Sequence, residues 1–207
     1  MSRTTMRRVA SVVAAASLLA GGLAATAATA SAASILSDFG STASVPDIPA
    51  SATVTVDNLV VTKSIVGSNQ IAVNGQVTYR TTISATAGPD RLITKLVDLN
   101  PVALLYVDGT AKVTSWQNGA MATESVTATA SANAGVAVSN AAGWLVSAIG
   151  NKTVTFDVTY SVKSVGFSTG IFDSGLAIDV AGMAEQQWPA MGVKLDLVGS
   201  VAPTFSS

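Results

Sequence analysis

The most constraining feature of this chain is a strict alternation of apolar and polar residues. It is clearest in Thr153–Val162, where the even-numbered residues are all apolar and the odd-numbered residues are threonine, aspartate or serine. Successive side chains of a β-strand point to opposite faces. This run therefore predicts a strand with one buried and one wet face.

The same period of two recurs along the chain at short intervals, separated by turn residues such as Asn74-Gly75, Asp108-Gly109 and Gly150-Asn151. Long stretches with helical spacing are missing after residue 32. Many short strands with such turns favour an all-β fold, an antiparallel sandwich of immunoglobulin-like or prealbumin-like type. The predicted strands lie in residues 53–65, 76–85, 91–99, 110–116, 125–140, 153–162, 176–180 and 193–198.

The first 32 residues have the order of a secretory signal peptide. Arg3, Arg7 and Arg8 form a basic region, an apolar run follows, and small residues end it. Cleavage after Ala30 or after Ala32 fits the A-x-A pattern, and Ala30-Ser31-Ala32 favours the second. The apolar run is short for a retained membrane anchor, which needs roughly 20 apolar residues. We therefore expect a secreted, extracellular chain without a transmembrane helix.

The expected organisation after the signal has three parts. Residues 33–52, with Pro46 and Pro49, are an N-terminal arm. Residues 53–163 form the sandwich, and residues 164–207 contain strands that complete or extend it. Removing the three arginines of the signal leaves 8 Lys and Arg against 12 Asp and Glu, a net charge of −4. This balance argues against a nucleic-acid partner.

The composition excludes several kinds of catalytic site. The chain has no histidine and no cysteine, which rules out Ser-His-Asp and Cys-His catalysis, disulfides and zinc sites that need either residue. The two glutamates, Glu124 and Glu185, lie in unrelated contexts, and the aspartates are scattered singly at turns and on wet strand faces. We therefore expect no enzyme activity, no cofactor and no metal site.

Five blocks of the sequence share a characteristic order and spacing: residues 59–64, 73–83, 93–101, 106–110 and 143–156. Together they resemble the immunoglobulin-like repeat of bacterial surface proteins known as the "domain of unknown function eleven" family, over about residues 57–163. Two departures from the family pattern are the stretch Ser84–Gly88 and the insertion of Asn100 before Pro101. The resemblance implies a surface or adhesive β-sandwich and no enzyme activity.

Lys63 is the most unusual single residue. It has the parity of Leu59, Val61 and Ile65, so its side chain points to the core side of the strand. A buried ammonium needs a partner, and the resemblance offers Asp98 after the third strand. Similar surface domains can bond such a lysine covalently to an Asn or Asp. Three interpretations stay open: a buried Lys63–Asp98 ion pair at the end of the sandwich, a lysine whose ammonium reaches out to water, or an isopeptide with Asp98 as the assisting acid.

The segment Gln186-Gln187-Trp188-Pro189 reads as a polar, Pro-bounded loop between two strands. Trp188 there could stack on a sugar or anchor a protein, with Gln186 and Gln187 beside it. The alternative is that Trp188 covers an open edge of the sandwich.

The expected function is a secreted, non-enzymatic β-sandwich that serves as a cell-surface structural or interaction module. Its expected partners are a cell-envelope polysaccharide or a protein, and its attachment to the envelope is non-covalent. The alternative is a porin-like β-rich oligomer of a mycolic-acid outer envelope. A mean hydropathy of +0.49 and a short likeness of residues 135–143 to such porins favour it, while the scattered aromatic residues, 5% of the chain, argue against it.

Overall fold

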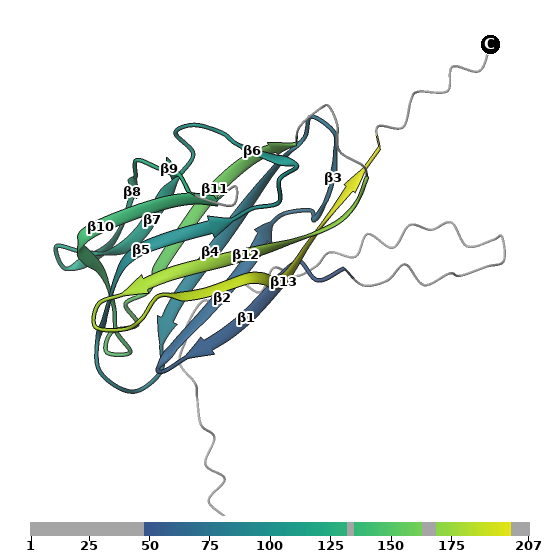
Figure 1. Cartoon of the computed structure of the whole chain (residues 1–207). Coiled ribbons are helices and arrows are strands. Elements are labelled where there is room, and N and C mark those ends of the chain that lie inside the picture. The colour runs from purple at the N-terminus through teal and green to yellow at the C-terminus, as the bar shows by residue number, and fades with distance from the viewer. Residues whose placement is uncertain (1–47, 132–134, 163–168, 200–207) are drawn as a thin grey trace, which may run out of the picture. The chain divides into compact units, whose positions relative to one another are not determined.

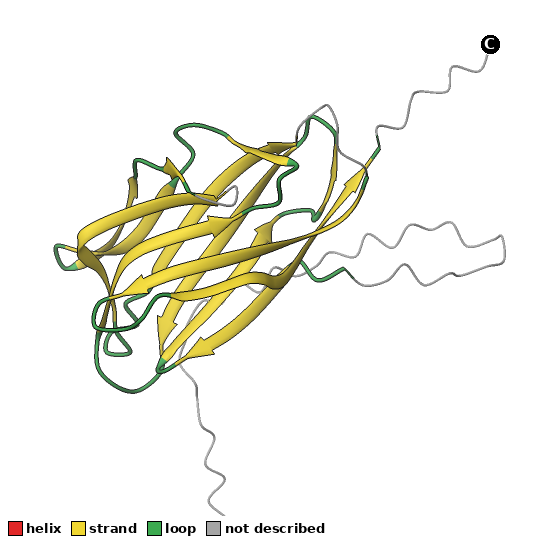
Figure 2. Cartoon of the chain, in the orientation of Figure 1, coloured by secondary structure: helices red, strands yellow, loops and turns green. Residues whose placement is uncertain are grey.

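The structure is a computed structural model that describes residues 48–131, 135–162 and 169–199. The predicted signal peptide and most of the predicted arm lie outside these residues. All the regular structure described is β-strand, arranged in two sheets (Figures 1 and 2). The all-β sandwich expected from the alternating pattern is therefore confirmed.

The first sheet, here called sheet A, contains the long alternating strands of the sequence. Its order is β1-β2-β4-β11-β7-β8, with β6 paired beside β11, and all its pairs are antiparallel. The strands are β1 (Ser51–Val56), β2 (Leu59–Val66), β4 (Gln76–Ala85), β6 (Leu104–Tyr106), β7 (Lys112–Gln117), β8 (Ala120–Ser125) and β11 (Val154–Val162).

The second sheet, sheet B, has the order β3-β13-β12-β5-β10-β9. It is antiparallel except where β3 joins β13 in parallel. Its strands are β3 (Gln70–Ala72), β5 (Arg91–Leu99), β9 (Thr129–Ala130), β10 (Gly135–Val146), β12 (Gly170–Val180) and β13 (Gln186–Val198). Strands β12 and β13 thus belong to the same sandwich as the preceding strands.

The hydrophobic core lies between the sheets. In β11 every second residue is buried, so Val154, Phe156, Val158, Tyr160 and Val162 face inward. The inward residues of β2 and β4 alternate in the same way. Burial of these apolar faces is the main stabilising term of such a fold.

Tight turns join the neighbouring strands and use residues that tolerate a positive φ. Asp57 has φ 52° between β1 and β2, and Asn118 and Gly119 have φ 49° and 90° between β7 and β8. Short polar side chains and glycine adopt this region at low cost. Strand β1 begins at Ser51, two residues before the expected start of the sandwich.

Candidate functional site

The candidate site is a charged cluster in the centre of the core, between the two sheets. Strand β2 of sheet A supplies Lys63, and strand β5 of sheet B supplies Asp98. Lys63 Nζ lies 2.7 Å from Asp98 Oδ2, and both residues have 0% relative exposure. A buried charge needs an opposite charge and hydrogen bonds to be stable, and each of these two groups has both.

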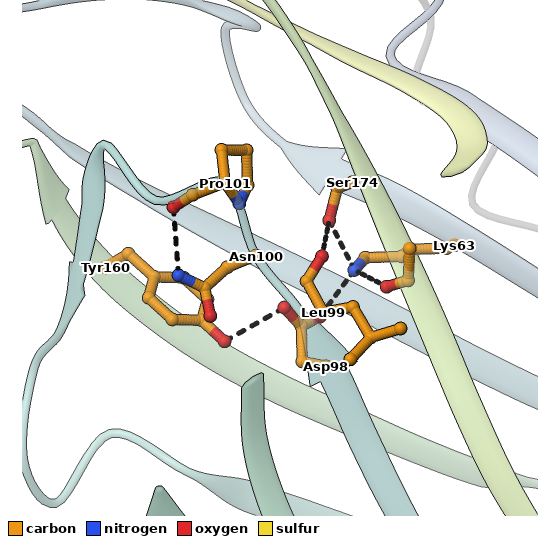
Figure 3. Close-up of polar contacts among 8 residues, drawn as sticks. Lys63, Asp98, Leu99, Asn100, Pro101, Tyr160 and Ser174 are labelled. Carbon is orange, nitrogen blue, oxygen red and sulfur yellow. Dashed lines mark hydrogen bonds and ion pairs between the residues drawn. The ribbon is translucent and has the colours of Figure 1, made fainter. Parts of the chain in front are cut away.

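The remaining bonds of the Lys63 ammonium go to β12 of sheet B. Nζ donates to Ser174 Oγ at 2.6 Å and to the carbonyl oxygen of Gly175 at 2.5 Å (Figure 3). Ser174 Oγ in turn donates to the carbonyl oxygen of Leu99 at 3.2 Å. The ammonium from sheet A is therefore held by one carboxylate, one hydroxyl and one carbonyl, all from sheet B.

The carboxylate of Asp98 has a second partner from sheet A. Tyr160 on β11 donates its hydroxyl to Asp98 Oδ1 at 2.9 Å (Figure 3). The ring of Tyr79 on β4 lies beside the cluster, with Lys63 Nζ 4.7 Å from the ring centroid. Tyr79 and Tyr160 also meet edge to face at 5.9 Å. A cation over an aromatic face is attracted by the ring quadrupole.

Burial sets the proton affinities of this cluster. The pKa of Lys63 is lowered from 10.5, because burial disfavours the charged amine more than Asp98 favours it. The pKa values of Tyr79 and Tyr160 are raised above 10.0, first by burial and then by the negative charge of Asp98. Both tyrosines therefore stay neutral throughout the physiological range, and Tyr160 keeps the proton that it donates to Asp98.

The geometry bears on the three interpretations of Lys63. Asp98 lies within ion-pair distance of the amine, and within residues 48–131, 135–162 and 169–199 no asparagine is hydrogen-bonded to Nζ. Asp157, a wet-face carboxylate, pairs instead with Arg80 on the outer face of sheet A. The described residues therefore contain the Lys63–Asp98 ion pair, and their contacts with Nζ offer no asparagine for an isopeptide.

The expectation that residues 186–191 form a loop was wrong. Gln186, Gln187 and Trp188 lie in β13, opposite Ile178, Ala177 and Leu176 of β12. Pro189 has no N–H to donate to the neighbouring strand. It is tolerated in β13 because the register shifts at this point, and a bulged residue does not take part in the regular hydrogen-bond ladder.

Trp188 is half-buried and packs against the core, so it is not a freely exposed anchor. Gln187 is exposed on the outer face of sheet B and lines a small hollow there with Lys95 and Glu185. A partner contact by Gln186, Gln187 and Trp188 stays a prediction.

Sequence reasoning did not find Tyr160, Ser174 or Gly175 as parts of the cluster. The buried face of β11 identifies Tyr160 as a core residue, but nothing local shows that its hydroxyl reaches Asp98. Ser174 and Gly175 lie 111 and 112 residues from Lys63, and only the strand order brings them together.

The described part of the chain contains no group of three or more metal-ligating side chains. Within the same residues there is no helix of the length and apolar character needed to span a membrane.

Comparisons with known proteins give similarity of fold at low identity. No family model matches the chain, and no curated protein matches it. The resemblance to the "domain of unknown function eleven" family therefore stays a prediction.

Three solved structures illustrate the likeness. AvmM, which catalyses macrocyclization in alchivemycin A biosynthesis, matches at 11% identity and a TM-score of 0.39, over 72% of this chain and 94% of its own. The major pilin subunit BcpA of Bacillus cereus matches at 13% identity and a TM-score of 0.41, over 68% of this chain and 40% of the pilin chain. The collagen-binding domain of a Staphylococcus aureus adhesin matches at 8% identity and a TM-score of 0.38, over 65% of this chain and 94% of the adhesin domain. At these scores the likeness carries no argument about function.

Proposed function

We propose that the mature chain is a non-enzymatic module of the bacterial cell surface, with a structural and interaction role outside the cell. The signal-like first 32 residues support export, with cleavage after Ala32. The sandwich fold supports a module that presents strand faces and loops to partners.

The observation that carries the proposal is the burial of the charged cluster. Lys63, Asp98, Tyr160 and Ser174 are all at 0% exposure. A substrate cannot reach these groups, although they are the residues that would otherwise suggest acid–base chemistry. Their bonds run between sheets A and B, so the cluster acts as a polar clamp across the core.

Cell fractionation tests the proposal. The full-length chain is expressed in its native host, and culture medium, a salt wash of the cells and a detergent extract are compared. We expect the mature chain in the medium or the salt wash, with Ala33 as its first residue by N-terminal sequencing. Recovery only in the detergent extract, or only inside lysed cells, contradicts the proposal.

A further inference from the structure

The outer face of sheet A, on the side away from the core, carries a polar cavity of 260 Å³. It lies across β4, β11 and the start of β7, and Gly109 is its one residue without a polar side chain. Its lining residues are Thr78, Gly109, Thr110, Lys112, Asp157 and Thr159. Each of the other lining side chains carries a hydroxyl or a charge, so a ligand there would meet hydrogen-bonding and charged groups.

The charges around this cavity leave one cation without an opposite charge. Asp157 is neutralised by Arg80, whose Nε and Nη2 donate to its two carboxylate oxygens at 2.7 Å each. Lys112 is directly opposite Asp157 in the register of β7 and β11, yet among the described residues it has no ion pair. The cavity is therefore complementary to a single negative charge, although the mature chain as a whole is acidic.

The hydroxyls of the cavity retain bonding capacity. Thr78 Oγ1 and Thr159 Oγ1 lie 2.8 Å apart, and because one proton serves that bond, the other hydroxyl proton is available to a ligand. Thr110 Oγ1 donates to the carbonyl oxygen of Val107 at 2.6 Å and accepts from the Thr159 N–H at 3.2 Å, which leaves it one lone pair to accept from a ligand. The site thus offers a cation together with groups that both donate and accept hydrogen bonds.

A row of threonines continues from this region across sheet A. Six threonines occupy directly opposed positions on six neighbouring strands, and two adjacent pairs of them share hydroxyl bonds of 2.8 and 2.7 Å. Strands lie about 4.8 Å apart, so the row extends about 24 Å. Its members, in order from β1 to β8, are Thr53, Thr62, Thr82, Thr155, Thr114 and Thr123.

We propose that this face binds a carboxylated extracellular polysaccharide, with an acid group at Lys112 and sugar hydroxyls along the threonine row. The inference rests on the proposed surface function and names its partner. One uncompensated cation suits a monoanion such as a uronic acid. The centre of a protein–protein interface is enriched in apolar and aromatic residues, whereas this face offers hydroxyls.

The experiment measures binding of the purified mature chain to alginate, a polyuronate, with neutral dextran as the comparison polymer. Lys112→Gln removes the unpaired cation. Lys95→Gln is the matched control, because it removes the same charge from the outer face of sheet B, where Lys95 lies 3.7 Å from Asp179. A triple variant, Thr62→Val, Thr82→Val and Thr155→Val, removes central hydroxyls but keeps β-branched residues that favour strands.

We expect alginate binding that weakens with salt, and no binding to dextran. Lys112→Gln should weaken it about tenfold, the effect of losing one charge-assisted bond, and the triple variant should weaken it at least as much. Lys95→Gln should change it less than about twofold. Absence of alginate binding, equal binding to dextran, or equal loss with Lys95→Gln overturns the inference. Since the fractionation experiment uses no polysaccharide, a surface-located chain that ignores alginate refutes only this inference.

Discussion

Lys63 places an ammonium in a core that is built mainly from aliphatic and aromatic side chains. Its contacts cross from sheet A to sheet B, and every hydrogen bond that it donates ends on sheet B. Such a pair is weak evidence for net stability, because desolvation offsets much of the attraction. Its removal from one side only is another matter, since that leaves the partner charged and buried.

The first prediction concerns the removal of one partner of the Lys63–Asp98 ion pair. Lys63→Met keeps much of the side chain's volume but leaves Asp98 buried in the core without an opposite charge. We expect the free energy of unfolding to fall by about 3–5 kcal/mol, measured by urea denaturation. Lys95→Met, at a half-exposed surface pair, should cost less than about 1 kcal/mol.

The double variant Lys63→Met/Asp98→Leu is the control that separates the effect of an unpaired buried charge from the effect of altered packing. It removes both charges together, so we expect it to be more stable than Lys63→Met alone. A double variant at least as unstable as the single one would show that the pair acts through packing rather than charge.

The second prediction is that Lys63 and Asp98 remain unbonded covalently. Both side-chain oxygens of Asp98 are engaged, Oδ2 by Lys63 Nζ and Oδ1 by the Tyr160 hydroxyl, and forming an amide would require one of them to leave as water. The intact mass of the purified mature chain should therefore equal the mass of its sequence. A mass lower by one water, lost again in Lys63→Met, would show an amide bond instead.

The third prediction follows from the tyrosines. The chain has three, and two of them, Tyr79 and Tyr160, have a pKa raised above 10.0 by burial. In an alkaline absorbance titration the folded chain should show less tyrosinate than the urea-unfolded chain at the same pH. Equal titration curves would mean that the two hydroxyls are open to water.

The raised pKa values of Tyr79 and Tyr160 also make the free energy of unfolding depend on pH. A raised pKa in the folded state means that the folded chain binds these protons more tightly, so the stabilisation is complete below pH 10 and declines as the pH rises further. The lowered pKa of Lys63 has the opposite effect, because the unfolded chain binds this proton more tightly; its contribution to stability rises with pH up to about pH 10.5, the ordinary pKa of lysine. The Lys63→Met variant should therefore lose stability more steeply in alkali than the native chain.

At the scale of the element, the bulge of β13 opposite Gly175 matters most. The register of β12 against β13 shifts between Ser174 and Leu176, and Gly175 lies at the shift. A β-carbon there would come within 2.3 Å of the carbonyl oxygens of Trp188 and Pro189. The same glycine presents its own carbonyl oxygen to Lys63, so the bulge helps to build the cluster.

The fourth prediction tests this element. Gly175→Ala must displace the β13 backbone, and we expect a loss of about 1–3 kcal/mol in the free energy of unfolding, as for overpacking. Gly199→Ala is the control, because its nearest neighbour would be a methyl of Thr169 at 3.6 Å. Equal thermal stability of the two variants would contradict the role given to the bulge.

The sequence predicted strands better than it predicted their ends and connections. β4 and β5 match the expected ranges because turn residues bound them on both sides. The range expected to contain the first strand holds the hairpin of β1 and β2, since Asp57 turns the chain at a positive φ between two β-branched segments. Pro189 suggested a loop where the structure has a bulged strand, because a proline is compatible with both.

For the whole molecule, the fold class could be predicted from alternation alone, while the candidate site could be predicted only in part. The parity of Lys63 and the position of Asp98 are local features. The partners Tyr160, Ser174 and Gly175 depend on which strands face each other across the core. The polar cavity and the threonine row depend on register between strands, which no single segment specifies.

The most direct test of the account is amine labelling of a live culture with a reagent that does not cross membranes, followed by peptide mass spectrometry. We expect modification at the exposed Lys112 and none at the buried Lys63, without cell lysis. This result requires that the chain is exported and that Lys63 is buried in the folded core with its partners. Labelling of the chain only after lysis, or modification of Lys63 at the same rate as Lys112, would contradict the account.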